Sequence, residues 1–257
     1  MNQQTKNTSW EKVAPWYGSL VKEKGHYYHE HVIFPNVLRL LQTRNIQTKA
    51  LLDLGCGPAV LAQHLPPSWT YWGIDLSPSM IKGAKSSSRQ NTNFWIADAT
   101  RTLPFSKKDF DVVLLILSLQ NIQEAEKVIE NAFLHLKPEG ELIIVLNHPL
   151  FRIPKQSSWE IDRKEKIQYR RVDGYLSFSD TPLQTNPSKG KNSEVVYSFH
   201  RPLSYYSQIL EKNKFTIQRI EEWISDKTSE GGCKEMEDKA RREFPLFLTL
   251  VAVKKSA

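Results

Sequence analysis

The sequence is poor in the residues that build disulfide frameworks and zinc sites. Only two cysteines occur among 257 residues, Cys56 and Cys233, and neither belongs to a CxxC pair. This scarcity argues against a disulfide scaffold and against a zinc knuckle, and it fits a reducing compartment. We therefore expect no structural metal and no disulfide.

Long apolar runs are also missing. The longest, "VVLLILSL" and "LFLTLVAV", are too short to cross a bilayer and predict buried strands instead. The first ten residues, "MNQQTKNTSW", are polar and lack the apolar segment of a signal peptide. Together these absences predict a cytoplasmic protein with no membrane span.

Charge of one sign is in excess, because the formal net charge is +7. Part of it is local: residues 152–171 hold seven Lys or Arg against three acids. A basic surface attracts nucleic acid, anionic lipid or an anionic small substrate. A solvated face accounts for the same pattern, and the sequence leaves both interpretations open.

From residue 50 onward, short apolar runs alternate with helical patterns, which is typical of a parallel sheet covered by helices. The predicted strands are "ALLDL", "TYWGIDL", "NFWIAD", "FDVVLLILSL" and "ELIIVLN". A helix is expected to open at Pro58, and a second at Pro78 with Ser77 as its cap. Residues 125–136 carry the clearest amphipathic period and are expected to end in the turn "KPEG".

The alternation breaks for about fifty residues after this fifth strand and then resumes with "EVVYSFH", a helix and two strands. We predict one domain in four parts. Residues 1–45 form an N-terminal helical cap, 46–148 the core that binds the ligand, 149–193 an inserted lid, and 194–257 the rest of the sheet. In open parallel sheets ligands bind at the carboxyl ends of the strands, where strand order reverses.

The turn after the first strand reads Gly55-Cys56-Gly57 and resembles a phosphate cradle, but two residues do not fit one. Val60 stands where a dinucleotide site needs its third glycine, and Asp53 would repel a pyrophosphate. A cationic ligand without phosphate removes both objections. S-adenosylmethionine, with its ammonium and sulfonium groups, has this chemistry.

The stretches "LLDLGCGPAVLAQHL", "YWGIDLSPSMI", "NFWIADATRTLPFSKKDFDVVLLILSL" and "AFLHLKPEGELIIVLNHP" resemble the successive motifs of class I S-adenosylmethionine-dependent methyltransferases. They are most similar to the small-molecule group of ubiquinone and menaquinone biosynthesis, with a methyltransferase type 11 domain. The resemblance implies a Rossmann-like α/β fold: a seven-stranded sheet with its last strand antiparallel and helices on both faces. It also implies transfer of a methyl group from S-adenosylmethionine to a small-molecule acceptor.

The same resemblance assigns the cofactor-binding residues. It implies that Asp53, Gly55 and Gly57 line the methionyl end, and that Asp75, followed by Leu76, holds the ribose hydroxyls. Asp98 and Ala99 would meet the adenine edge, and Leu117 would lie under the ligand. The family often has a further glycine where this sequence has Ala59, and alanine is its smallest replacement.

Three groups are candidates for the acceptor side. His148 directly follows the fifth strand and is either a general base or a histidine that stabilises the turn before Pro149. The segment with Tyr28 and His29 contacts substrate or packs; its histidines lack carboxylate or cysteine partners, so no metal is expected. The remaining candidates, Arg152, Trp159, Tyr169 and His200, would hold an anionic or aromatic acceptor.

Three other functions are weighed against this one. A tRNA or rRNA methyltransferase is favoured by the basic charge and disfavoured by the absence of an RNA-binding appendage and of the amine-methylation motif after the fourth strand, which reads "SLQNIQ". A non-catalytic partner protein that only binds the donor stays open. A dinucleotide oxidoreductase is disfavoured by Asp53 and Val60.

Overall fold

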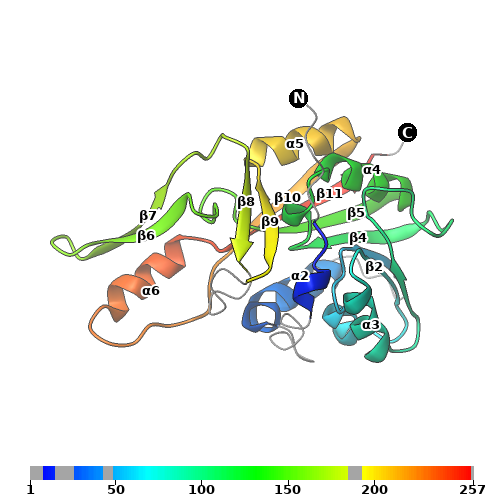
Figure 1. Ribbon diagram of the computed structural model, residues 1–257, viewed down its shortest axis with the longest axis horizontal. Coiled ribbons are helices and arrows are strands. Elements are labelled where there is room, and N and C mark those ends of the chain that lie inside the picture. The colour runs from blue at the N-terminus through cyan, green and yellow to red at the C-terminus, as the bar shows by residue number, and fades with distance from the viewer. Residues whose placement is uncertain (1–7, 15–25, 43–48, 185–192, 256–257) are drawn as a thin grey trace.

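Seven strands form the central sheet of the protein in a computed structural model that describes residues 8–14, 26–42, 49–184 and 193–255. Their order is β10-β11-β5-β4-β1-β2-β3; β11 runs antiparallel to both of its neighbours, β10 and β5, and the strands from β5 to β3 pair in parallel (Figure 1). The strands are β1 (Ala50–Leu54), β2 (Thr70–Asp75), β3 (Thr92–Ile96), β4 (Phe110–Ile116), β5 (Leu136–Asn147), β10 (Phe215–Trp223) and β11 (Phe247–Lys254). The predicted seven-stranded sheet with an antiparallel last strand is confirmed.

The chain crosses from one side of β1 to the other between β3 and β4, so strand order reverses beside β1. Such a reversal separates the loops that follow neighbouring parallel strands and leaves a crevice at their carboxyl ends. The predicted cofactor residues all lie on or just after these strands. The topology therefore sets where the site must be.

Helices cover both faces of the sheet. The π-helical turn η2 (His29–Ile33), α2 (Phe34–Gln42) and α3 (Pro78–Ser86) pack on the face that carries Leu51. On the opposite face, which carries Leu52, lie α4 (Ala125–His135) and α5 (Leu203–Lys212). The side chains of adjacent residues of β1 thus pack into different hydrophobic cores, because successive side chains of a strand point to opposite faces of the sheet. Of the six positions predicted for the amphipathic stripe of α4, Ala125, Val128, Ile129 and Ala132 are fully buried, Phe133 is partly buried, and Leu136 already belongs to β5.

Two local predictions need correction. No α-helix opens at Pro58, because Ala59 adopts a left-handed backbone (φ 54°) and only the short 3₁₀ helix η3 (Val60–His64) follows it. The stretch "KPEG" is not a separate turn, because it lies within β5 as an irregularity in its pairing with β4. The second predicted helix is confirmed: Ser77 Oγ accepts a hydrogen bond from Met80 N at 3.2 Å, and Pro78 opens the helix.

The segment after β5 forms two small antiparallel sheets. One is the hairpin of β6 (Ser157–Asp162) and β7 (Ile167–Val172), and the other pairs β8 (Ser179–Gln184) with β9 (Val195–His200). The expectation that residues 195–200 belong to the central sheet is therefore wrong. Residues 1–7, 15–25, 43–48 and 185–192 of the predicted cap, core and lid lie outside the described residues.

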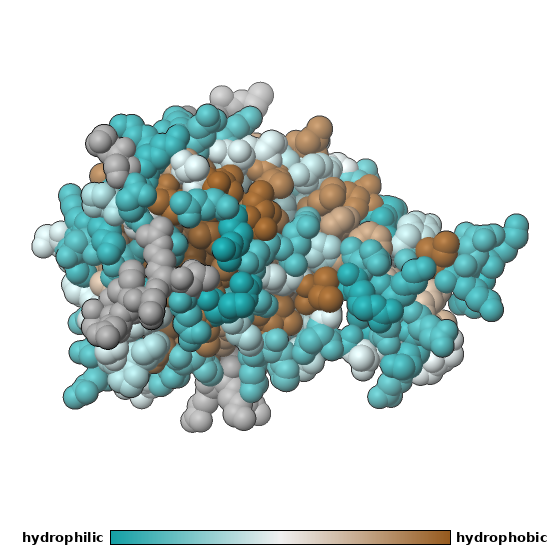
Figure 2. All heavy atoms as spheres, turned by 180° about the vertical axis from the view of Figure 1, so that it is seen from behind, coloured by the Kyte–Doolittle hydropathy of each residue, from teal (hydrophilic) through white to brown (hydrophobic). Residues whose placement is uncertain are grey.

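The β6–β7 hairpin projects from the sheet next to α6 (Lys234–Glu243), while the β8–β9 pair lies nearer the centre (Figure 1). Seen from behind, this projecting end is covered mainly by hydrophilic side chains, and apolar side chains gather closer to the middle of the molecule (Figure 2). Among the described helices none combines the length and the apolar character needed to cross a membrane.

Candidate functional site

A cavity of about 600 Å³ opens at the carboxyl ends of β1, β2 and β4, where the topology predicts a ligand site. Strand tips and the loops after them line one part of it. The rest of the wall comes from the N-terminal segments, from the segment after β5, from the β8–β9 pair and from the start of β11. Segments far apart in the sequence therefore share one space.

The turn after β1 places two glycines at this cavity in a left-handed conformation, Gly55 at φ 82° and Gly57 at φ 55°. A Cβ atom on Gly55 would lie 2.6 Å from Cβ of Ser118, which is closer than side chains tolerate. A Cβ atom on Gly57 would meet nothing within 4 Å, so its backbone borders open space. The left-handed backbone and the close approach of Ser118 both require glycine at position 55, and the main chain at Gly57 is accessible to a ligand.

Asp53 lies at the bottom of the site with a side chain that is only partly satisfied. The residue is 4% exposed, and its Oδ2 accepts a hydrogen bond from the hydroxyl of Tyr71 at 2.6 Å. Within the described residues its Oδ1 has no hydrogen-bond partner. Burial raises the pKa of this carboxyl to about 7, against the opposing effect of the Tyr71 hydrogen bond. A buried acceptor of this kind favours a cationic donor from a ligand.

Asp75 ties the glycine turn to the beginning of α3. Its Oδ2 accepts from Gly57 N at 3.0 Å and its Oδ1 from Ser77 N at 2.9 Å. A carboxylate has about four acceptor positions, so two remain for a ligand. Burial raises the pKa of Asp75, and Leu76 beside it lines the cavity with 40% of its surface exposed.

The other predicted cofactor residues also line the cavity. Asp98 is fixed through its Oδ1, which accepts from Thr100 N at 2.8 Å and Thr100 Oγ1 at 2.7 Å, and Ala99 follows it. Leu117 is held in a left-handed conformation (φ 54°) after β4, where its N donates to Val145 O. Strained backbone of this kind is common at ligand sites.

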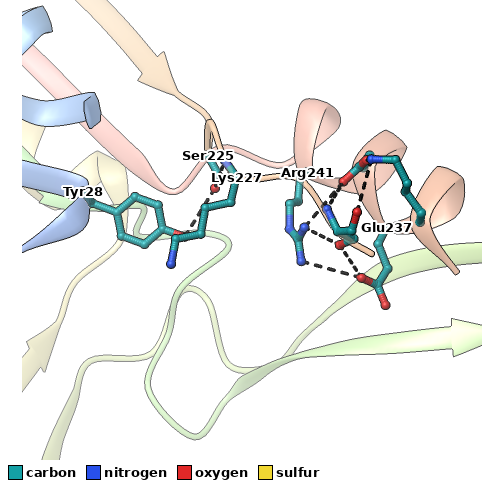
Figure 3. A network of polar contacts seen from close by, with 8 residues as sticks. Tyr28, Ser225, Lys227, Glu237 and Arg241 are labelled. Atoms are coloured by element: carbon teal, nitrogen blue, oxygen red, sulfur yellow. Dashed lines mark hydrogen bonds and ion pairs between the residues drawn. The ribbon is translucent and has the colours of Figure 1, made fainter. Parts of the chain in front are cut away.

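Three of the predicted acceptor residues, Tyr28, His29 and Arg152, line the same cavity. Tyr28 is held by a 3.3 Å hydrogen bond between its hydroxyl and Ser225 Oγ, and Lys227 Nζ lies 5.1 Å from the centre of its ring (Figure 3). Burial lowers the pKa of His29 to about 4. The ring is therefore neutral at pH 7.

The structure places three other predicted substrate residues outside the cavity lining. Trp159 and Tyr169 lie on the β6–β7 hairpin, where Trp159 packs edge-on against Phe244. His200 ends β9, and its Nε2 contacts Tyr175 O at 2.8 Å. The sequence placed Trp159 and Tyr169 in the lid and His200 after it, but it did not show which of these strands face the site.

His148 is buried next to the site, yet it is not part of the cavity lining. Its Nε2 lies 2.8 Å from Glu222 Oε1, and its Nδ1 accepts from Leu150 N at 3.2 Å and Phe151 N at 3.4 Å. Both ring nitrogens are thus engaged by protein groups. This geometry favours the histidine that stabilises the turn and speaks against the general base.

Several residues of the site had not been singled out from the sequence. Tyr71 is the partner of Asp53, Asn147 and Phe247 border Arg152, and Leu183 and Val196 bring the β8–β9 pair to the cavity. Asn147 ends β5, so the rule that strand ends carry the site would have found it. The others depend on packing between distant segments. No group of three or more metal-ligating side chains occurs within the described ranges.

Comparison with known proteins agrees with this geometry. Residues 52–144 match the family described as methyltransferase domain. The chain is 29% identical over 135 residues to the ubiquinone/menaquinone biosynthesis C-methyltransferase of Wigglesworthia glossinidia brevipalpis, covering 49% of this chain and 54% of that protein. It is 28% identical over 117 residues to a ubiquinone biosynthesis O-methyltransferase of Coxiella burnetii, covering 44% and 50%. The chain thus spans about half the length of the curated relatives it matches.

Solved structures share most of the fold. A Listeria monocytogenes protein assigned as an S-adenosylmethionine-dependent methyltransferase is 26% identical, with a TM-score of 0.65 over 87% of this chain and 98% of that chain. One from Mesorhizobium loti is 22% identical, with a TM-score of 0.64 over 85% and 96%. Fold and site define the class as the Rossmann-like methyltransferases. The methyltransferase-domain match over residues 52–144 and these structural neighbours together support a class I S-adenosylmethionine-dependent methyltransferase.

The residues present fit S-adenosylmethionine as cofactor. The unpartnered Oδ1 of Asp53 suits an ammonium group, the two remaining acceptor positions of Asp75 suit a pair of hydroxyls, and the open backbone at Gly57 permits close approach. A pyrophosphate would instead meet the buried carboxyl group of Asp53 and the half-buried one of Asp75. The chemistry of the lining therefore agrees with the family.

Proposed function

We propose that the protein transfers a methyl group from S-adenosylmethionine to a small-molecule acceptor. One observation carries the proposal. A single cavity joins the strand ends that carry Asp53 and Asp75 to a wall formed by Tyr28, His29 and Arg152. A donor held by the carboxylates would leave the second part of the cavity for an acceptor.

S-adenosylmethionine, when bound, supplies a methyl group already activated for in-line displacement. The chain then has to hold two molecules in line and keep water away, which by itself contributes several kcal/mol. We assign Asp53 and Asp75 to donor binding, the glycine turn to close backbone contact, and the β8–β9 pair to covering the acceptor. A general base is required only where the accepting atom carries a proton. The neutral ring of His29 lies in the cavity and His148 does not.

Two further observations favour a small acceptor. The curated relatives named above carry quinone-biosynthesis names, and by those names they methylate small molecules at carbon or oxygen. The basic surplus of the lid lies largely on the β6–β7 hairpin, where Arg163, Lys164 and Arg171 are exposed and none lines the cavity. Apart from Arg152, the basic residues that favoured an RNA substrate therefore do not line the proposed site.

Binding and turnover test the proposal separately. Isothermal calorimetry should detect S-adenosylhomocysteine and S-adenosylmethionine and no comparable heat with NAD. Asp75→Asn removes one acceptor oxygen and the charge, which is worth about 1.5–3 kcal/mol for a hydrogen bond to a charged group, or a loss of about 10- to 100-fold in affinity. Asp109→Asn, on a side chain 73% exposed, is the matched control and should change nothing.

The outcomes separate the alternatives. Equal affinity for NAD would reject the cofactor assignment. Donor binding without release of S-adenosylhomocysteine across a broad panel of small acceptors would favour the non-catalytic partner. Methylation of RNA in place of the panel, with retention on RNA that falls steeply with salt, would favour the RNA methyltransferase.

A further inference from the structure

Arg152 is a cation of the cavity wall whose guanidinium has no acidic partner. It donates from Nη1 to Asn147 Oδ1 at 2.6 Å, and its Cζ lies 5.5 Å from the centre of the Phe247 ring. Among the described residues it forms no ion pair, whereas Arg39, Arg171, Arg219 and Arg241 each have a carboxylate within 4 Å. A guanidinium has five N–H donors, so this side chain keeps unused hydrogen-bonding capacity.

The surroundings of Arg152 are cationic or neutral. Burial is the main cause that lowers the pKa of Arg152; the smaller effects come from Tyr28 and Arg170, and no carboxylate contributes. The charges of Arg152 and Lys227 both lower the pKa of His26, a further residue of the cavity wall, after the larger effect of burial. Both cations therefore lie close enough to act on the same ring.

The carboxylates of the cavity lie on other segments. Asp53, Asp75, Asp98 and Glu124 belong to β1, β2 and the loops after β3 and β4, whereas Arg152 lies in the turn after β5. A partly buried cation without a negative partner costs free energy, and sites that contain one commonly bind an anion. The aromatic ring of Phe247 lies against the guanidinium, and the apolar side chains of Leu183 and Val196 line the same cavity.

We propose that Arg152 binds a carboxylate on the methyl acceptor, so that the acceptor is an acid with an apolar or aromatic body. The inference rests on the proposed function, since it names the substrate class of the same cavity. A planar guanidinium matches a carboxylate through two parallel hydrogen bonds, and one arginine balances one negative charge. Asn147 occupies one N–H group and so fixes the orientation of the remaining ones.

The test measures binding of matched acids and esters to protein saturated with S-adenosylhomocysteine. The probes are benzoate, 4-hydroxybenzoate and 2-naphthoate, each compared with its methyl ester by ligand-observed NMR. At least one acid should bind ten times more tightly than its ester. Arg152→Gln should abolish this preference while leaving the affinity for S-adenosylhomocysteine unchanged, and Arg152→Lys should retain part of it. Arg171→Gln, an exposed arginine of the lid, is the control and should keep the full preference.

Each result decides the matter. Esters that bind as well as their acids, or no binding by any acid of the panel, would overturn the inference and leave the methyltransferase proposal intact. An acid preference that survives Arg152→Gln would also overturn it. Should that variant lose S-adenosylhomocysteine binding, Arg152→Met serves as the second neutral variant of similar length, and a loss in both would assign Arg152 to the donor and overturn the inference. Failure of the wild-type protein to bind S-adenosylhomocysteine would refute the proposed function instead.

Discussion

Asp53→Asn offers the sharpest test of why a buried carboxylate lies beneath the glycine turn. The substitution keeps the shape of the side chain and removes its charge. A pKa of about 7 in place of the ordinary 3.8 corresponds to about 4 kcal/mol of unfavourable free energy in the ionised folded state. This carboxyl is therefore a cost to the protein without ligand above pH 7.

The sign of the pH effect follows from the raised pKa. Between about pH 4 and 7 the folded protein holds a proton that the unfolded chain has lost, so stability falls as pH rises through this range. Asparagine never ionises, and its amide can still contact the Tyr71 hydroxyl. At pH 8 and without ligand, we expect the variant to be more stable than the wild type by about 1–3 kcal/mol and to unfold at a higher temperature. The gain is smaller than the full cost of the ionised carboxyl because the new amide is only partly satisfied.

Donor binding should change in the opposite direction. Two unit charges about 4 Å apart at an effective dielectric constant of 20 interact by about 4 kcal/mol, so the variant should bind S-adenosylhomocysteine about 100- to 1,000-fold more weakly. In the wild type the affinity should fall about tenfold for each pH unit below 7, where the ligand's own amino group stays protonated. The variant should lose this dependence.

Calorimetry from pH 5.5 to 8 and thermal denaturation with and without S-adenosylhomocysteine measure both effects on the same samples. Asp109→Asn again serves as the exposed control. Unchanged ligand affinity in Asp53→Asn would refute the role given to this carboxylate. A variant that is less stable at pH 8 in the absence of ligand would refute the electrostatic reasoning.

Three other substitutions probe the supports of the site. Ala59→Gly should raise the free energy of unfolding by up to about 1 kcal/mol, because alanine is strained at φ 54°, and a decrease measured by urea unfolding would contradict this. His148→Ala should cost about 1–3 kcal/mol of stability with turnover retained. Burial lowers the pKa of His148, so the stability that this side chain contributes decreases as pH falls below about 6.5. A loss of activity without a loss of stability would instead indicate a general base. Glu11→Gln should weaken S-adenosylhomocysteine binding several-fold in calorimetry. Glu11 accepts hydrogen bonds from Ser79 N at 2.9 Å and Ser79 Oγ at 2.6 Å, and these bonds anchor the segment that brings Trp10 to the cavity. Equal affinity in the variant would show that this anchor is dispensable.

The sequence predicted the sheet well because its central strands are buried on both faces. A run such as "DVVLLI" leaves little choice of environment, and turn signals such as Ser77-Pro78 mark where a helix begins. The hairpin of β6 and β7 escaped prediction for the opposite reason. Its residues alternate between exposed and half-buried, so it has no apolar face from which a strand pattern can be recognised.

Helix α6 was missed on the same grounds. Its ten residues read "KEMEDKARRE", and only Ala240 among them is buried. Ion pairs between residues three or four positions apart, such as Lys234 with Asp238, stabilise this helix, which has no apolar stripe. The misplacement of β9 has a different cause. Apolar alternation in "VVYSFH" predicts a strand but does not specify its partner, and the antiparallel strand β8 lay inside the segment expected to be irregular.

The two ends of the cavity differ in how far a sequence can define them. The donor end is built from consecutive strand ends, so a local pattern with the right spacing brings Asp53, Asp75 and Asp98 together once the sheet forms. The acceptor end combines the N-terminal helix, the turn after β5, the β8–β9 pair and the start of β11. None of these segments is adjacent in sequence, and each packs on the sheet for reasons of its own. Loops attached to a fixed sheet can change without disturbing the donor site. This division explains why the cofactor followed from the motifs, whereas the substrate class had to be inferred from the unpaired charge of Arg152.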